Sequence, residues 1–377
     1  MEYELIATAT FGIEAVLAKE LKALGYEDLK VENGSVSFQG DERDIAACNI
    51  WLRTADRILI KMKEFKAESF EELFQGTLSV DFGALIPENG VMHITGKSIK
   101  SKLHSVPDCQ GIVKKAVVEA MKRKYNKDWF SEDGPIYKIE VAILKDIVTL
   151  TIDTTGAGLH KRGYRENSGG APLKETLAAA LVLLSDWNTD KLLVDPMCGS
   201  GTIAIEAALI GKNIAPGLNR SFVSESWPTM DEEIWEEARN YAKRKINDKE
   251  FKILCSDIDG WVIKTGKDNA RKAGVYDFLS FERTDVADYK SSKKYGVIIS
   301  NPPYGERIGE IEEVKELYKV LGRTFENLDS WSYYILTANK DFQELFGRRA
   351  EKNRKLYNGR ILCYYYQYTG NANATGK

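Results

Sequence analysis

The second half of the chain alternates near-continuous apolar segments with longer amphipathic ones, and this alternation constrains the fold more than any other feature. Strands that alternate with helices predict a parallel, doubly wound α/β sheet with helices on both faces. The ending differs, because residues 355–358 and 361–368 predict two strands around an Asn-Gly turn. Residues 173–370 are therefore expected to form one domain whose sheet closes with an antiparallel hairpin. Its other expected strands are 191–194, 251–256, 278–283, 296–300 and 332–337, and its expected helices are 173–184, 201–211, 261–273, 312–325 and 341–347.

The first 155 residues predict two smaller α/β units. Residues 1–65 follow the order βαββαβ of a ferredoxin-like unit, with a hairpin turn at Asn33-Gly34 and a helix capped by Asp41 or Asp44. Residues 66–155 predict two helices and three strands. The glycine-rich residues 156–172 are expected to be a linker, and residues 371–377 a disordered tail. The expected strands are 3–8, 29–31, 36–38, 58–62, 91–95, 137–144 and 147–153, and the expected helices are 12–24, 41–52, 68–74 and 107–125.

Composition argues against a membrane protein and gives no sign of a metal site. The chain has no apolar run of about eighteen residues, and Met1 is not followed by the pattern of a signal peptide, so we expect the protein in the cytoplasm. The five cysteines and three histidines are widely spaced, which predicts free thiols and no bound metal. With 53 Lys and Arg against 56 Asp and Glu, the net charge of −3 does not by itself indicate a polyanion partner.

Basic residues are nevertheless concentrated in one segment. Between Lys97 and Lys127 there are nine Lys and Arg but only two acids, Asp108 and Glu119, which is an excess of seven. Contacts to phosphate groups require such a local excess, although a charged stretch is more often a solvated helix face. The residues expected to contact nucleic acid, called the basic stripe below, are Lys97, Lys100, Lys102, Lys114, Lys115, Lys122 and Arg123.

A glycine-rich loop follows the expected strand at 191–194 and opens a helix. Gly199 and Gly201 would let the backbone bend sharply and approach a ligand closely. The loop lacks the Lys-Ser/Thr of a P-loop and the third glycine of a dinucleotide site, and the preceding acid suits an amino-bearing ligand. The alternative is a tight turn that serves packing alone. The candidate ligand-binding residues are Asp195, Pro196, Cys198, Gly199, Ser200, Gly201 and Thr202.

Two further acids are expected at the ends of the next two strands. Asp257 ends the segment 253–257, where a carboxylate can accept hydrogen bonds from both hydroxyls of a ribose. Asp285 ends the segment 281–285 and could accept a hydrogen bond from an adenine amino group. Either acid alone could be a cap or a turn former. Together with Asp195 they outline a crevice with the shape of a nucleoside.

The most specific motif is Asn301-Pro302-Pro303-Tyr304, directly after an apolar strand. The prolines fix the backbone and leave the carbonyl of Pro302 without a local partner. The side-chain oxygen of Asn301 and that carbonyl can converge on one –NH₂ group, and Tyr304 offers a ring for stacking. An amine held in this way directs its lone pair at a methyl donor. A rigid turn without function is the alternative.

The whole chain resembles the THUMP-domain RNA methyltransferases, closest to the bacterial enzymes that methylate guanine N2 in large-subunit (23S) ribosomal RNA. The stretches that carry the resemblance are 158–165, 171–179, 195–208 and 301–308, and the resemblance extends from about residue 3 to 368. It implies a class I methyltransferase domain that uses S-adenosylmethionine, with catalytic residues Asn301 to Tyr304 and with Asn301 also touching the cofactor. It also makes residues 66–155 a THUMP domain that binds RNA. Some relatives continue into a second methyltransferase domain, and the sequence given ends at Lys377, so only the guanine-N2 activity is implied.

Three other functions are compatible with these motifs. The first is methylation of guanine N2 in transfer RNA or of adenine N6 in nucleic acid, because the Asn301–Tyr304 motif does not distinguish these amines. The second is methylation of a protein amine, which would not need a basic N-terminal half. The third is an RNA-binding protein with a degenerate methyltransferase fold, which is disfavoured because every motif residue is present.

Overall fold

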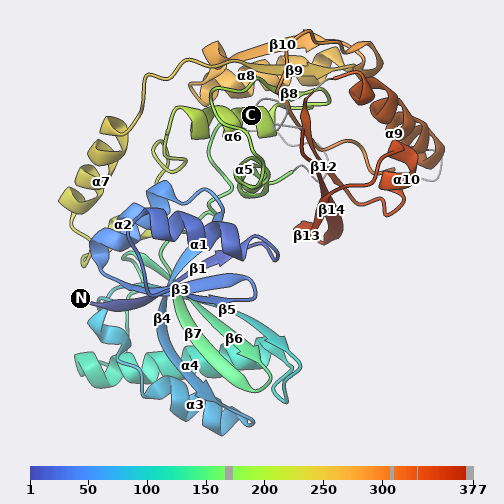
Figure 1. Cartoon of the computed structure of the whole chain (residues 1–377). Coiled ribbons are helices and arrows are strands. Elements are labelled where there is room, and N and C mark those ends of the chain that lie inside the picture. Colours follow the sequence, from blue (N-terminus) through green and yellow to red (C-terminus); the bar gives the residue numbers. More distant parts are fainter. Residues whose placement is uncertain (166–172, 306–309, 329, 371–377) are drawn as a thin grey trace.

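The computed structural model of the chain describes residues 1–165, 173–305, 310–328 and 330–370. Within these ranges the chain forms two α/β units, and each unit is built on one seven-stranded sheet (Figure 1). No helix among the described residues is long and apolar enough to cross a membrane.

The N-terminal sheet is continuous across the boundary expected at residues 65 and 66. Its order is β2-β3-β1-β4-β7-β6-β5, and only β5 and β6 pair in parallel. The long strand β4 makes the sheet continuous, because it pairs with β1 on one side and with β7 on the other. The ferredoxin-like and THUMP units therefore share one sheet. Its strands are β1 (Tyr3–Ala9), β2 (Lys30–Glu32), β3 (Ser35–Gly40), β4 (Ala55–Lys66), β5 (Val91–Ile99), β6 (Ile136–Leu144) and β7 (Ile147–Asp153).

Four helices accompany this sheet. The start of α2 decides between the two predicted caps, because the Asp41 carboxylate accepts a hydrogen bond from the Arg43 N–H at 2.8 Å. On α4, Val113 and Val117 are buried in the same apolar cluster as Tyr137 of β6, so this helix covers one face of the THUMP half. The helices are α1 (Glu14–Ala23), α2 (Glu42–Trp51), α3 (Phe70–Leu78) and α4 (Val106–Tyr125), and a 3₁₀ turn, η1, spans Phe82–Ala84.

The C-terminal sheet has the predicted parallel, doubly wound topology. Its order is β10-β9-β8-β11-β12-β14-β13, with parallel pairing from β10 to β12 and antiparallel pairing of the closing hairpin. The predicted fold class is therefore confirmed. The strands are β8 (Leu193–Asp195), β9 (Ile253–Asp257), β10 (Leu279–Arg283), β11 (Val297–Ser300), β12 (Ser332–Thr337), β13 (Lys352–Asn358) and β14 (Ile361–Tyr368).

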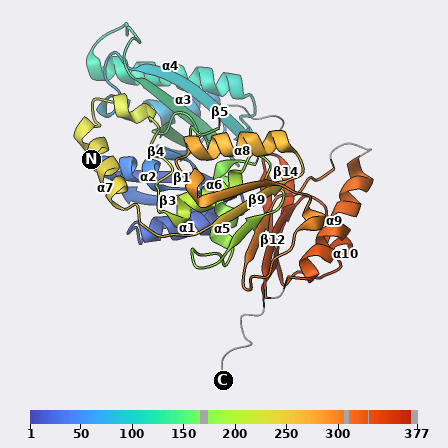
Figure 2. The ribbon, with the colours of Figure 1, turned by 90° about the horizontal axis from the view of Figure 1, so that it is seen from above.

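Helices cover both faces of this sheet (Figure 2). Val297 and Ile299 of β11 pack in the cluster that contains α5, α6 and α8, whereas Ile298 packs with α9 and α10. Because side chains alternate along a strand, β11 is apolar on both faces, as a central parallel strand requires. The helices are α5 (Glu175–Leu184), α6 (Thr202–Gly211), α8 (Gly260–Lys272), α9 (Glu310–Glu326) and α10 (Phe342–Phe346), with 3₁₀ turns η2 (Val223–Ser226), η3 (Tyr276–Phe278) and η4 (Val286–Asp288).

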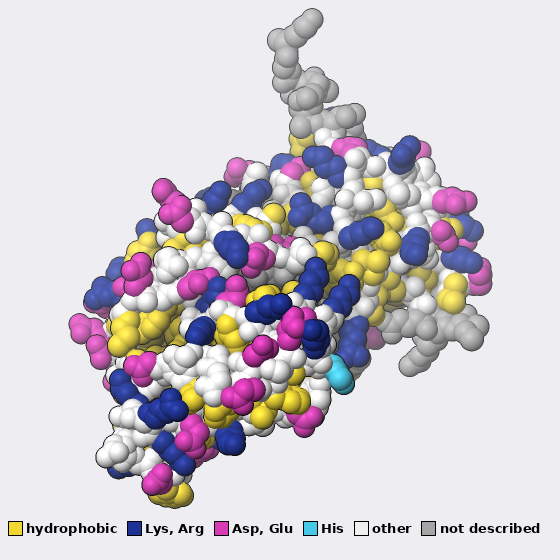
Figure 3. All heavy atoms as spheres, turned by 90° about the horizontal axis from the view of Figure 1, so that it is seen from below, with side chains coloured by type: hydrophobic (Ala, Val, Ile, Leu, Met, Phe, Trp, Pro, Cys, Tyr) yellow, Lys and Arg dark blue, Asp and Glu magenta, His cyan; other side chains and the backbone are white. Residues whose placement is uncertain are grey.

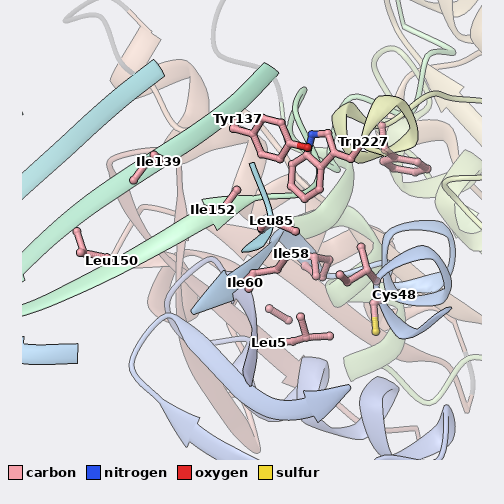
Figure 4. Packing of buried hydrophobic residues seen from close by; sticks show 14 of the residues in the cluster. Leu5, Cys48, Ile58, Ile60, Leu85, Tyr137, Ile139, Leu150, Ile152 and Trp227 are labelled. Carbon is pink, nitrogen blue, oxygen red and sulfur yellow. The ribbon is translucent and has the colours of Figure 1, made fainter. Parts of the chain in front are cut away.

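The segment between α6 and β9 was not assigned any structure from the sequence, and it binds the two units together. It contains α7 (Glu232–Arg244), which packs beside α2 of the N-terminal unit (Figure 1). Trp227 stacks on Tyr137 of β6 with ring centroids 4.6 Å apart (Figure 4), and its indole N–H donates to the Ile136 carbonyl at 2.9 Å. This segment therefore completes the core of the N-terminal unit, although it lies in the sequence of the other domain.

The described part of the expected linker is packed against both units. Leu159, Arg162 and Tyr164 are buried. The Arg162 guanidinium donates to the Arg53 carbonyl of the N-terminal unit and lies 3.5 Å from the buried carboxylate of Glu206 on α6. Residues 156–165 thus form a structured junction. Residues 166–172 and the expected tail at 371–377 lie outside the described residues.

Candidate functional site

One cavity of about 660 Å³ opens at the carboxyl ends of the parallel strands. In an open α/β sheet, ligands bind in the crevice at this edge. The cavity brings together residues that follow β8, β9, β10 and β11 with single residues from α9 and β13. Its lining residues are Pro196, Met197, Gly199, Asp257, Ile258, Asp285, Val286, Asn301, Pro302, Pro303, Tyr304, Gly305, Leu317 and Asn358.

The glycine-rich loop has the conformation that its glycines predict. Gly199 and Gly201 have φ values of +51° and +81°, which residues with a Cβ rarely adopt. The Gly199 N–H donates to the carboxylate of Asp257 at 2.9 Å, so the loop is tied to the end of the neighbouring strand β9. This contact brings the loop and one of the predicted acids into a single wall of the cavity.

Asp195 does not line the cavity but lies beneath it. Its side chain is buried, and its carboxylate accepts hydrogen bonds from the Ser300 hydroxyl at 2.9 Å and the Met197 N–H at 3.4 Å. Burial raises the pKa of Asp195 to about 7. The residue therefore links the glycine-rich loop to the end of β11. Of the loop residues predicted to bind a ligand, Pro196 and Gly199 line the cavity, whereas Asp195, Cys198, Ser200, Gly201 and Thr202 do not.

The other two predicted acids both line the cavity. Asp257 accepts the N–H groups of Gly199 and Asp259, at 2.9 and 3.0 Å, which holds its carboxylate in one orientation. Asp285 lies two residues beyond the end of β10 and caps η4 by accepting the Ala287 N–H at 2.9 Å. Both acids thus have a structural contact as well as a position on the cavity wall.

The motif after β11 forms the opposite wall. The hydroxyl of Tyr318 on α9 donates to the Pro303 carbonyl at 2.7 Å, which fixes the turn from behind. Among the described residues no donor bonds the Pro302 carbonyl. The Tyr304 hydroxyl donates to the side-chain oxygen of Asn301, and burial raises the pKa of Tyr304 well above its usual value. All four predicted catalytic residues therefore line the cavity together.

Sequence reasoning missed several lining residues. Ile258 follows Asp257 directly and is 62% exposed, so it forms part of the cavity mouth. Leu317 comes from α9, and Asn358 comes from the end of β13, far from the motifs in sequence. The Asn-Gly pair at 358–359 was recognised only as a turn signal. In the described residues, no group of three or more His, Cys, Asp or Glu is arranged to hold a metal ion.

Four of the seven residues of the basic stripe pair with acids, and three of these acids come from other parts of the chain. Lys97 pairs with Glu140 at 2.8 Å, Lys114 with Glu132 at 2.6 Å and Lys122 with Glu119 at 3.3 Å. Lys102 pairs with Glu68, and Lys115 lies 5.6 Å from the centre of the Phe74 ring. Within the described residues, Lys100 and Arg123 have no acid at ion-pair distance. On the face of the molecule that Figure 3 shows, basic and acidic side chains are interspersed.

The stripe is also divided between the two sides of the THUMP half of the sheet. On β5, a Cβ at Gly96 would meet side chains of α4, so Gly96 faces that helix and its neighbour Lys97 faces the other way. Lys114, Lys115, Lys122 and Arg123 belong to α4 itself. The seven residues therefore do not form one continuous surface.

Comparison with known proteins identifies the domains in the same order. Residues 4–59 match the model of an RlmL ferredoxin-like domain, residues 67–153 match a THUMP domain, and residues 162–367 match an RMKL-like methyltransferase domain. YpsC of Bacillus subtilis (strain 168), an RNA methyltransferase by name, is 54% identical over 370 residues, which cover 97% of this chain and 96% of YpsC.

Solved structures agree over the whole chain. SMU.472, a methyltransferase by name that was solved in complex with SAH (S-adenosylhomocysteine), is 47% identical with a TM-score of 0.94, and the match covers 98% of both chains. A protein of Listeria monocytogenes str. 4b F2365 that is named as an N6-adenine-specific DNA methylase is 49% identical with a TM-score of 0.94, over 98% of this chain and 97% of its own. TrmN from Thermus thermophilus, 19% identical with a TM-score of 0.69 over 98% of this chain and all of its own, shares the fold. The chain therefore belongs to the RMKL-like methyltransferases, with an RlmL ferredoxin-like domain and a THUMP domain before its S-adenosylmethionine-dependent catalytic domain.

Proposed function

We propose that this protein transfers a methyl group from S-adenosylmethionine to the exocyclic N2 amine of a guanine in large-subunit ribosomal RNA. The observation that carries the proposal is the single cavity between two functional walls. Asp257 and Asp285 line one wall, and Asn301 to Tyr304 line the other. A nucleoside-type cofactor on the first wall would place a reactive group next to an amine held on the second.

The residues present fit this cofactor. The Asp257 carboxylate uses one oxygen for Gly199 and the other for Asp259, and each oxygen keeps lone pairs for the ribose hydroxyls. The exposed Ile258 side chain beside it offers an apolar surface for the adenine ring, and Asp285 could accept from the adenine amine. When bound, S-adenosylmethionine supplies an electrophilic methyl group on a sulfonium ion. The volume of about 660 Å³ lies within the usual range for small-molecule sites.

The second wall would hold and orient the target amine. An exocyclic amine is a weak nucleophile, because its lone pair is delocalised into the ring. The side-chain oxygen of Asn301 and the carbonyl of Pro302 would each accept one N–H, which favours a pyramidal nitrogen and directs its lone pair. A strong general base is unnecessary, because the methylated amine is cationic and readily loses its proton. Pro303 would contribute rigidity, since its carbonyl is anchored by Tyr318.

Tyr304 would hold the base after it leaves the RNA stack. A base inside a helix cannot reach a cavity of this depth, so the target must be single-stranded or flipped out. The ring of Tyr304 provides the surface on which it stacks. In the structure its hydroxyl donates to Asn301, so the oxygen proposed to accept from the amine already has a hydrogen-bonded partner. An amide oxygen has two lone pairs, so Asn301 could accept from the amine while Tyr304 keeps its hydrogen bond.

RNA is the substrate that the N-terminal half favours. The chain carries a THUMP domain, and its relative YpsC is an RNA methyltransferase by name. Guanine-N2 methylation of transfer RNA remains a second candidate on the same site. Adenine-N6 methylation of nucleic acid is a third, because the Listeria relative is named for that reaction.

Nucleoside mass spectrometry tests the proposal directly. Ribosomal and transfer RNA from a strain that lacks the gene would be incubated with purified protein and S-adenosylmethionine, then digested. We expect N2-methylguanosine to appear in large-subunit ribosomal RNA. Asn301→Ala should give no product even when S-adenosylmethionine is saturating, because the lost contacts act in the transition state. Methyladenosine as the product, or methylation of transfer RNA alone, would overturn the assignment.

A further inference from the structure

Asn358 is a polar residue on the cavity wall that would hold the target amine. It lies outside the Asn301–Tyr304 motif. It ends β13, and its neighbour Gly359 has a φ of +62° that turns the chain into β14. Its side chain is only 8% exposed, yet it lines the cavity together with Asn301 and Tyr304. A nearly buried amide in such a place has four hydrogen-bonding positions to satisfy, two N–H groups and two oxygen lone pairs.

The hydrogen bonds of Tyr304 determine how the Asn358 amide is oriented. A phenol has one proton, and Tyr304 donates it to the side-chain oxygen of Asn301. The side chain of Asn358 opposes the rise in the pKa of Tyr304 that burial causes, which is the effect of an N–H directed at the phenol oxygen. With its proton already donated to Asn301, the hydroxyl can only accept from Asn358, so the amide turns its N–H toward Tyr304. The carbonyl oxygen of Asn358 is then the group left to accept a hydrogen bond from a ligand in the cavity.

The strand that carries Asn358 is held firmly by the N-terminal unit. The guanidinium of Arg354 donates to the Gly12 carbonyl at 3.2 Å, and the ring of Tyr357 lies edge-on to Phe11 with centroids 5.8 Å apart. Tyr357 thus contacts the N-terminal unit, while the next residue, Asn358, lines the cavity. The end of β13 that carries the amide is therefore held in place by the N-terminal unit.

We propose that Asn358 is a specificity residue that selects guanine over adenine through the ring nitrogen beside the reacting amine. In guanine, the N2 amine lies next to an N1–H donor, so two neighbouring acceptors, Asn301 and Asn358, match it. In adenine, the N6 amine lies next to an N1 lone pair, which would face the oxygen of Asn358 without a proton between them. An unpaired acceptor of this kind is costly in a buried site. This inference rests on the proposed function and names the feature of the base that the site recognises.

The test compares guanine with 2-aminopurine at the methylated position. 2-Aminopurine keeps the amine at position 2 but has an unprotonated N1. The methylated position would first be located by mass spectrometry of RNA fragments. A short RNA with either base at that position would then be methylated in single turnover by the wild type, Asn358→Ala and Asn358→Asp. Asn327→Ala is the matched control, since Asn327 is an exposed asparagine just after α9 and does not line the cavity. S-adenosylhomocysteine binding by calorimetry checks that every variant is folded.

The ratio of the two rates is the readout, because the intrinsic reactivity of the two amines cancels between variants. The preference for guanine should fall by about 10- to 100-fold in Asn358→Ala, the effect of losing one hydrogen bond to a buried polar group. It should persist in Asn358→Asp, whose carboxylate still accepts the N1–H, and in the control. A preference in Asn358→Ala equal to that of the wild type would refute the role of Asn358, as would equal loss in Asn358→Asp. If the methylated nucleoside is instead a methyladenosine, the proposed function itself has failed.

Discussion

The buried carboxyl of Asp195 should make the stability of this protein depend on pH, and Asp195→Asn should remove that dependence. Burial raises the pKa of Asp195 from 3.8 to about 7, a difference of about 3 pH units, or about 4 kcal/mol at 1.36 kcal/mol per unit. The folded-state pKa is the higher one, so the unfolded chain releases this proton first. The protonated carboxyl of Asp195 therefore makes its full contribution to the free energy of unfolding below pH 3.8, and this contribution is lost as the pH rises to about 7.

The size of the effect between two convenient pH values follows from the same two constants. By linkage, the wild type has lost about 1.7 kcal/mol of this contribution at pH 5 and about 4.3 kcal/mol at pH 8. Asparagine has no charge to desolvate, and its oxygen can still accept from Ser300 and from the Met197 N–H. Asp195→Asn should therefore gain about 2.6 kcal/mol in free energy of unfolding relative to the wild type between pH 5 and pH 8.

Urea unfolding at pH 5, 6, 7 and 8, followed by tryptophan fluorescence, would measure this difference. Ser300→Ala provides a second arm, because the hydrogen bond from Ser300 lowers the pKa of Asp195. Its loss should raise the folded-state pKa of Asp195 further, so the pH-dependent part of the curve should begin at the same pH and extend to higher pH. A difference between Asp195→Asn and the wild type that is the same at pH 5 and pH 8 would refute the reasoning, because Asp195 would then carry the same charge in both states.

Three further changes test the proposed site and the basic stripe. Asp257→Ala should weaken S-adenosylhomocysteine binding by about 1–3 kcal/mol in calorimetry through lost ribose hydrogen bonds, and wild-type affinity would exclude that contact. Tyr304→Phe should keep more single-turnover activity than Tyr304→Ala, which loses about 1–3 kcal/mol of stacking; equal losses would assign the main role to the hydroxyl. Alanine should replace four residues of α4 at once, namely Lys114, Lys115, Lys122 and Arg123. The variant should bind RNA more weakly, and its salt dependence should fall by fewer than four ion equivalents, because Lys114 and Lys122 are already paired with acids. An unchanged salt slope would make the stripe a solvated face.

The catalytic sheet could be predicted from the sequence because its strands are buried on both faces. Val297, Ile298 and Ile299 are all apolar because helices cover both sides of β11. The strand assignments then predicted that residues at the ends of neighbouring strands would lie close together, and Asp257, Asp285 and Asn301 do line one cavity. Local turn chemistry was equally informative, because Gly34 has the positive φ that the predicted hairpin needs.

Features that depend on distant partners could not be predicted in the same way. Helix α7 is amphipathic, but nothing in its sequence indicates that Trp235 packs in the core of the N-terminal unit. Asp195 was predicted to contact the ligand because it precedes a glycine-rich loop; it is buried because Ser300, a residue 105 positions later, lies beside it. The excess of cations in the basic stripe also depends on distant partners. Glu68 and Glu140, which pair with stripe residues, lie outside the segment in which charges were counted.

The contacts between the two units also bear on how a THUMP domain and a catalytic site can act on one RNA. Contacts from separate parts of the chain join them, among them α7 on α2, Arg162 between Arg53 and Glu206, and Phe11 against Tyr357. Because these contacts belong to different parts of the chain, a hinge motion at one of them would strain the others. RNA held by the N-terminal unit would therefore meet the Asn301 wall at a fixed distance and orientation. The position of the methylated nucleotide would then be set by the shape of the RNA, while its identity as guanine would be set inside the cavity.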